Sequence, residues 1–122
     1  MTDLNQELNW EQVLFSLILH AGNARSKAKE AAEYAENGEW QAAQESLDEA
    51  NAEQCQAHKI NADIIRLEAS EKAVPFSVLL IHSMDLLLLA WSELDFTEQY
   101  IKLNQRVKAL EVEIAQWRSP QN

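Results

Sequence analysis

The sequence predicts an all-α fold, an antiparallel up-down-up bundle of three long helices in a single domain. Residues that break helices are scarce, since the 122 residues include only two glycines and two prolines. Apolar residues recur at alternating intervals of three and four, which is the spacing of helices packed side by side. No stretch shows the strict alternation of a half-buried strand. Long helices with short connections place neighbours antiparallel.

The first helix is predicted from about Asn9 to Asn37. Gly38 is expected to end it, because glycine suits the left-handed position that follows a helix. Residues 1–8 and 119–122, at the two ends of the domain, are predicted to be flexible. The apolar residues of the first helix are Trp10, Leu14, Leu17, Ala21, Ala24, Ala28, Ala31 and Ala35.

The second helix is predicted from about Glu39 to Ala69. Its alanines are small, which lets two helix backbones approach closely, so the first two helices are expected to pack tightly. Gln54 and Asn61 interrupt an apolar face formed by Trp40, Ala43, Leu47, Ala50, Ala57 and Ile64, with Ile60 and Leu67 widening it.

The third helix is predicted from about Phe76 to Trp117, with Pro75 in its first turn and Ser119-Pro120 beyond its end. The part up to Trp91 is apolar nearly all round, and such a helix is expected to be buried all round. A three-helix bundle leaves one face of each helix in water, so this segment predicts self-association. The later part is amphipathic through Phe96, Tyr100, Leu103, Val107, Leu110, Ile114 and Trp117.

His82 and Asp85 lie within this apolar segment and are the main candidate site. Residues three apart share a helix face, so the imidazole and the carboxylate should be close together. His82 is interpreted as a nucleophile or ligand, with a hydrogen-bonded core histidine as the alternative. Asp85 could orient the imidazole, bind a cation, or merely hydrogen-bond to a neighbouring helix.

Four other residues are weaker candidates. His20 opens the turn Ala21–Ser26, which either packs closely at Gly22 or lines a pocket facing His82. His58 is expected to be structural. Arg25 is expected to form an ion pair rather than bind a phosphate. Cys55, the lone cysteine, is expected to be a small packed residue.

Composition excludes several classes of protein. The formal net charge of -10 argues against a nucleic-acid partner, which needs a basic surface, and favours partners with basic patches. No secretory signal is visible, the longest apolar run is too short to span a membrane, and a single cysteine suits a reducing compartment. These features predict a soluble cytoplasmic protein.

The chain resembles the enzyme IIA component of the lactose/cellobiose (chitobiose) class of the bacterial phosphotransferase system. The resemblance covers residues from about Trp10 to Val107. It is carried by Ala21–Ser26, the turn Asn37–Trp40, Ala57-His58, Glu68–Ser70 and above all Pro75–Asp85.

The resemblance implies a cytoplasmic phosphotransferase component that works as a homotrimer of three-helix subunits. It implies that His82 takes a phosphoryl group from the histidine-containing phosphocarrier protein and passes it to enzyme IIB. The sugar would be a disaccharide of the lactose/cellobiose/chitobiose class, and contact with the membrane would be indirect, through the sugar permease. It also implies that three copies of Asp85 meet around one magnesium ion per trimer.

Three residues depart from the usual family pattern. Met84 stands in place of a glutamine, Leu86 in place of a second histidine, and Asn23 in place of an aspartate. The first two support an alternative hypothesis, a divergent non-catalytic regulatory or interaction paralogue. A histidine phosphotransfer domain of two-component signalling ranks third, because His82 has no nearby lysine or glycine in the sequence.

Overall fold

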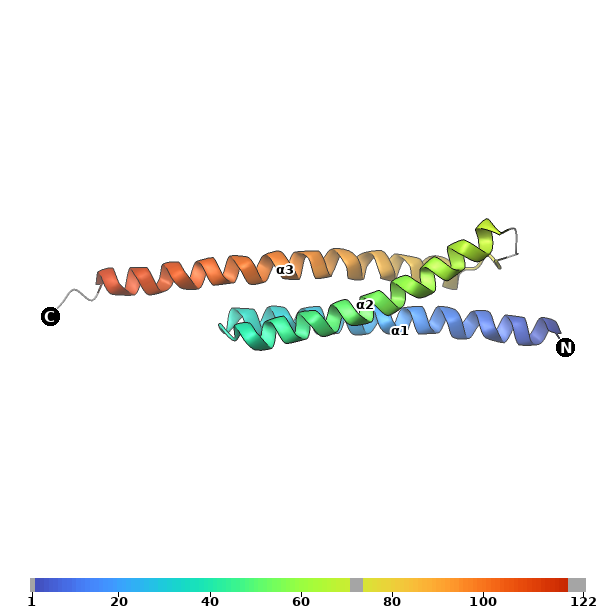
Figure 1. Ribbon diagram of the computed structural model, residues 1–122, viewed down its shortest axis with the longest axis horizontal. Coiled ribbons are helices and arrows are strands. Elements are labelled where there is room, and N and C mark those ends of the chain that lie inside the picture. The colour runs from blue at the N-terminus through green and yellow to red at the C-terminus, as the bar shows by residue number, and fades with distance from the viewer. Residues whose placement is uncertain (1, 71–73, 119–122) are drawn as a thin grey trace.

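The computed structural model describes residues 2–70 and 74–118, with side chains described from Asn9 onward. This part of the chain is all-helical and consists of three helices, α1 (Thr2–Glu36), α2 (Trp40–Ala69) and α3 (Val78–Arg118) (Figure 1). The prediction of three long helices is therefore confirmed. Ser119-Pro120 and residues 119–122 lie outside the described residues, and the flexibility of the two ends stays a prediction.

Figure 1 shows α2 returning along α1, and α3 running in the same direction as α1. The polar contacts between helices agree with these directions. From α1 to α2, His20 pairs with Glu53 and Lys27 pairs with Glu49, so the numbers rise in α1 as they fall in α2. Between α1 and α3, by contrast, the residue numbers of the contacts rise together along both helices. Arg25 pairs with Glu93, and further along Glu36 accepts a hydrogen bond from Tyr100.

The core between the helices is built largely from alanine. The predicted apolar face of α1 is buried from Leu14 to Ala35, and Trp10 is half-buried. On α2, Ile64 is buried as predicted, whereas Leu67 is exposed. Alanine adds no side chain beyond Cβ, so the backbones can pack closely. Eight residues form the central cluster: Ala21, Ala24, Ala28, Ala50, Ala57, Leu87, Ala90 and Leu94.

The turn between α1 and α2 is a Schellman motif. The Glu39 N–H donates to the Tyr34 carbonyl at 2.9 Å, and the Gly38 N–H donates to the Ala35 carbonyl at 3.1 Å. Gly38 has a φ of 75°, the left-handed conformation in which a glycine has no Cβ to clash. The predicted role of Gly38 is confirmed.

Two helix starts differ from the prediction. α1 begins at Thr2 rather than near Asn9, because residues 2–8 contain no glycine or proline that would stop it. α3 begins at Val78, so Pro75 precedes the helix instead of lying in its first turn. The start of α3 is capped by Ser77, whose hydroxyl accepts a hydrogen bond from the Leu80 N–H at 3.1 Å.

The face of α3 that packs on α1 and α2 is also different from the predicted one. It consists of Ser83, Leu87, Ala90, Leu94, Thr97 and Ile101. The residues of the predicted face point away from the bundle instead, except Tyr100, which is half-buried, and Phe96 is 71% exposed. We call Leu89, Phe96, Leu103, Val107, Leu110, Ile114 and Trp117 the outward stripe; all seven are exposed.

The last part of α3 extends beyond the other two helices. Figure 1 shows it projecting past the turn that joins α1 to α2, at the end of the molecule opposite the N-terminus. From Lys102 to Arg118 every side chain is exposed except Asn104, which is half-buried. We call this segment the α3 extension.

Candidate functional site

His82 and Asp85 lie on the second and third turns of α3, and both side chains are exposed in the single chain. Within the single chain α1 and α2 cover only one side of α3, as expected of a three-helix bundle, and the burial of the other side by self-association stays a prediction. At about 100° per residue, Asp85 points about 180° away from Leu94, which faces the core. His82 lies about 60° round the helix from Asp85, so the two can share one open surface.

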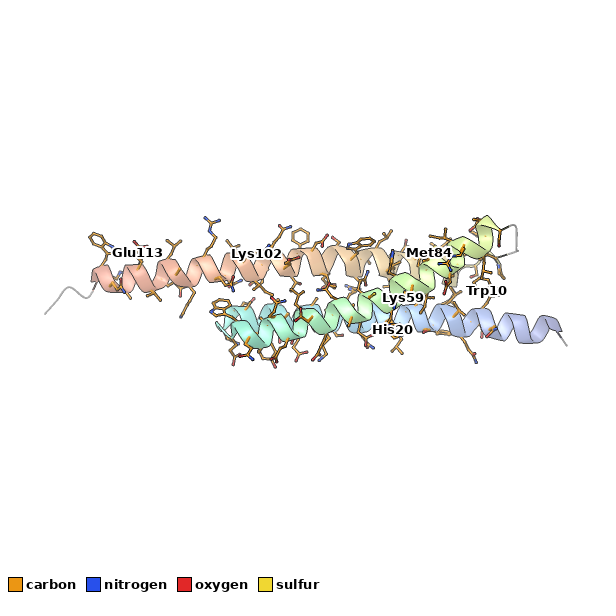
Figure 2. The ribbon with its side chains drawn as sticks, in the orientation of Figure 1. Trp10, His20, Lys59, Met84, Lys102 and Glu113 are labelled. Atoms are coloured by element: carbon orange, nitrogen blue, oxygen red, sulfur yellow. The ribbon has the colours of Figure 1, made fainter. Side chains whose placement is uncertain are left out.

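Two serine hydroxyls hydrogen-bond to the backbone of the first turns of α3, next to His82. Ser77 caps the helix, and the Ser83 hydroxyl donates to the Leu80 carbonyl at 2.8 Å. Ser83 is fully buried against the bundle, so the residue that follows His82 is anchored while the imidazole faces outward. Figure 2 shows Met84, two residues further on, near the start of α3 and where α2 approaches it.

His20 and His58 each have a partner in the chain. His20 Nδ1 lies 2.6 Å from Oε2 of Glu53, and this contact joins α1 to α2. The imidazole of His58 packs edge-on against the Trp91 ring, with centroids 5.7 Å apart. In the described residues, no hydrogen bond or ion pair joins the His82 imidazole to another side chain. Of the three histidines, His82 is thus the one with neither an ion pair nor an aromatic contact among the described residues.

The hollow described at the turn that begins at His20 lies between α1 and α2 and does not include His82. It is lined by Asn23, Ser26, Lys27, Glu49, Ala52 and Glu53, all from α1 and α2. Gly22 does not mark close packing either, because a Cβ built on it meets nothing within 4 Å. The predicted close packing at this turn is therefore wrong, because Gly22 is an exposed glycine within a helix, and a pocket facing His82 stays a prediction.

Arg25 forms an ion pair, as predicted. Its Nε donates to Oε2 of Glu93 at 2.6 Å and ties α1 to α3. Cys55 is exposed, which contradicts its prediction as a packed residue. It follows Gln54 on α2, and Gln54 takes the buried position of that turn instead.

Sequence reasoning missed the polar contacts within the core and along α1. The Gln54 amide donates to the Leu87 carbonyl at 3.2 Å, which explains one interruption of the apolar face. Lys27 bridges Glu49 at 2.8 Å and Glu30 at 3.1 Å, and hydrogen bonds to these carboxylates raise the pKa of its ammonium group. The i, i+3 spacing of Lys27 and Glu30 was the one signal available in the sequence.

The described residues of a single chain do not bring together a complete set of metal ligands. Among the described residues, no three His, Cys, Asp or Glu side chains come together in a group that could hold an ion. Asp85 contributes one exposed carboxylate on the outer side of α3. Any cation at Asp85 therefore needs oxygen ligands from other copies of the chain or from water.

The sequence matches the family model described as the PTS system, Lactose/Cellobiose specific IIA subunit, over residues 12–105. The chain belongs to this family of IIA subunits. The matched segment includes the serine-capped start of α3, His82 and Asp85, and it ends within α3. The resemblance that the sequence carries is confirmed. The match includes the first four residues of the α3 extension, and the part from residue 106 onward lies beyond it.

Several relatives of this IIA chain share most of its length. The lichenan-specific phosphotransferase enzyme IIA component of Bacillus subtilis is 33% identical over 85% of this chain and 93% of its own. The lactose-specific EIIA component of Lactococcus lactis is 34% identical, over 75% of this chain and 88% of its own. The PTS cellobiose-specific enzyme IIA from Bacillus anthracis, known from a crystal structure, is 36% identical in sequence. The match covers 82% of this chain and 92% of that chain, with a TM-score of 0.80. The IIA chain is thus a component of the sugar phosphotransferase system.

Within residues 2–70 and 74–118, no helix combines the length and the apolar character that a membrane span requires.

Proposed function

We propose that this IIA subunit is a phosphocarrier whose His82 accepts a phosphoryl group from the histidine-containing phosphocarrier protein and passes it to enzyme IIB. The observation that carries the proposal is the exposure of His82 on a rigid helix, with no side-chain partner among the described residues. Phosphoryl transfer depends on positioning and on charge stabilisation, so an accessible imidazole on a fixed backbone suits it.

The transfer itself requires a neutral imidazole. One ring nitrogen of His82 attacks the phosphorus, forming an N–P bond as the N–P bond to the donor histidine breaks. Handing the group to a cysteine thiolate of enzyme IIB reverses this at His82, breaking the N–P bond and forming an S–P bond. The net charge of -10 favours docking onto basic surfaces of the donor and acceptor.

The names of the relatives support a substrate class. They act in systems for lichenan, N,N'-diacetylchitobiose, cellobiose and lactose. We propose that this subunit serves the uptake of a disaccharide of the lactose/cellobiose/chitobiose class, by passing the phosphoryl group to enzyme IIB and so meeting the membrane only indirectly, through the sugar permease.

We also propose that the working assembly is a homotrimer in which the outer side of α3 faces the threefold axis. Leu88 and Leu89 are 63% and 53% exposed in one chain and would supply apolar area. Three copies of Asp85 at the axis would repel one another, so they would share a cation, with magnesium the expected ion.

The test is the mass of the protein after incubation with phosphoenolpyruvate and the general phosphotransferase proteins. One added phosphate is expected on the unchanged chain, and none on His82→Gln. His20→Gln and His58→Gln are the matched controls and should still gain one phosphate. His82→Gln should change the free energy of unfolding by less than about 0.5 kcal/mol, because its side chain is exposed.

A second candidate is the non-catalytic interaction paralogue, favoured by Met84 and Leu86. Its signature in the same assay is a folded protein that never gains phosphate. Met84→Gln then asks whether a restored amide next to His82 recovers phosphorylation.

A further inference from the structure

Two buried oxygen atoms on α2 have no hydrogen-bond donor among the described residues. They are Oε1 of Gln54 and Oδ1 of Asn61. The two residues are seven apart, so their amides lie two turns, or about 10 Å, apart along one side of the helix. Buried polar groups in native proteins are nearly always bonded to protein or to ordered water, and leaving one unbonded is unfavourable. Each of these oxygens therefore needs a donor.

The bond that Gln54 makes through its nitrogen shows which part of α3 lies opposite. Its Nε2 donates to the Leu87 carbonyl at 3.2 Å. α2 and α3 run in opposite directions (Figure 1), so two turns further along α2 correspond to two turns back along α3. Asn61 is therefore level with Leu80. Asparagine is one methylene shorter than glutamine, so Asn61 reaches less far toward the facing helix than Gln54 does.

The ion pairs that α1 makes with the other two helices give the same level. Counted from the pair with Glu53 on α2, Asn61 is level with residue 12 of α1. Counted from the pair with Glu93 on α3, Leu80 is level with the same residue 12. Two independent routes thus place Asn61 opposite Leu80, and we call this level of the bundle the Asn61 layer.

Ser83 presents a second buried acceptor in the Asn61 layer. It lies on the inner face of α3, three residues after Leu80, and it is fully buried. The single hydrogen of its hydroxyl is used in the bond to the Leu80 carbonyl at 2.8 Å. The oxygen keeps lone pairs with which to accept a bond. Asn61 Oδ1 and Ser83 Oγ are therefore two acceptors on facing helices, and neither offers a hydrogen to the other.

Among the described residues of the Asn61 layer, no group supplies the missing donor. The backbone N–H groups of the three helices are engaged in the hydrogen bonds of their own helices. The buried side chains nearest this level are apolar, Leu14 and Leu17 on α1 and Ile64 on α2. A water molecule donates two hydrogen bonds and fits a small polar gap between helices. A cation would instead bring an unpaired charge into an apolar core.

We propose that an internal water bridges Asn61 Oδ1 on α2 and Ser83 Oγ on α3, donating one hydrogen bond to each. Ser83 directly follows His82, so the bridge ties the backbone of the segment that carries the imidazole to α2. The water site goes beyond the proposed phosphocarrier function and does not depend on phosphorylation.

Relaxation dispersion of water oxygen-17 tests the site, because it counts the water molecules that stay inside a protein for longer than the protein tumbles. The unchanged full chain is compared with Asn61→Leu, which keeps a side chain of similar size and removes the acceptor. We expect one long-lived water fewer per chain. Asn51→Leu is the matched control, since Asn51 is exposed on the same helix, and it should keep the count. An unchanged count in Asn61→Leu would overturn the proposal.

Ser83→Ala tests the second acceptor. The change removes one oxygen and favours helix formation, so the variant should fold. A water left with one partner exchanges faster, so the count should again fall by one. A long-lived water that persists in Ser83→Ala would refute the bridge.

Thermal unfolding separates a bridging water from a direct bond. Asn61→Leu combined with Ser83→Ala removes both acceptors, so its Tm should be no lower than that of the less stable single variant, because a partner left unbonded costs more than a pair removed together. Losses of Tm that simply add would contradict the bridge. Coupled losses without any change in the water count would mean that the Asn61 amide bonds Ser83 directly, with its oxygen and nitrogen exchanged, and the water would be refuted.

Discussion

Nε of Arg25 on α1 donates to Oε2 of Glu93 on α3 across 2.6 Å, an ion pair that joins the first and last helices of the chain. The two side chains are 42% and 37% exposed, so water and salt screen their attraction. The pair fixes the register of α1 on α3 more than it stabilises the fold.

A double-mutant cycle with Arg25→Ala and Glu93→Ala should therefore give a small coupling. We expect about 0.2–1 kcal/mol in the free energy of unfolding, the range for exposed pairs. Urea unfolding of the four proteins at low and high salt measures it. A coupling above about 2 kcal/mol that persists in salt would mean that the pair is desolvated in the protein.

The two glycines should respond in opposite directions to replacement by alanine. Gly38→Ala forces a Cβ into the left-handed conformation at a φ of 75° and should destabilise the protein by about 1–2 kcal/mol. Gly22→Ala lies within α1, where a Cβ meets nothing within 4 Å, and should stabilise it by about 0.5–1 kcal/mol. Thermal unfolding of both variants provides the comparison, and equal shifts of the same sign would contradict the assigned turn.

Tyr100 should ionise at higher pH than an ordinary tyrosine. Its hydroxyl donates to a Glu36 carboxylate oxygen, which favours the protonated phenol and raises the pKa above 10.0. A raised pKa in the folded state means that this contribution to stability is complete below about pH 10 and is lost as the phenol ionises at higher pH. Absorbance titration of Tyr34→Phe isolates Tyr100, and adding Glu36→Gln should lower the midpoint.

The helices, their apolar faces on α1 and α2, and the turn at Gly38 could be predicted from the sequence. The inner face of α3 could not. On α3 the buried residues from Ser83 to Ile101 and the residues of the outward stripe both recur at intervals of three and four. The outward stripe has the larger side chains, yet it faces away from the bundle. Ser83 and Thr97 can occupy the inner face because each hydroxyl donates to a carbonyl of its own helix, at 2.8 Å in both cases.

The candidate site was found from its residue types. His82 and Asp85 share a segment that is apolar nearly all round, whereas a three-helix bundle covers only one side of each helix. The large leucines next to them are exposed, because the alanine-rich faces of α1 and α2 cover only one side of α3. Sequence alone could not tell which side chains of this segment lie on the covered side, because nearly all of them are apolar.

Asp85 and Leu89 offer the sharpest test of the proposed assembly. Both lie on the outer side of α3, so neither substitution should disturb the fold of one chain. Asp85→Leu removes the repulsion between carboxylates and should give a trimer that no longer responds to magnesium or to a chelator. Leu89→Glu puts a charge into the same surface and should shift the protein toward monomer, because burying unpaired charge is unfavourable.

Sedimentation with and without chelator measures both effects. Glu98→Leu is the matched control, since it replaces an exposed carboxylate of α3 that lies about 140° round the helix from Asp85. If the unchanged protein sediments as a monomer under all conditions, the trimer is refuted together with its cation. If it sediments as a trimer both with and without chelator, the apolar surface around Leu89 holds the subunits together and Asp85 binds no ion.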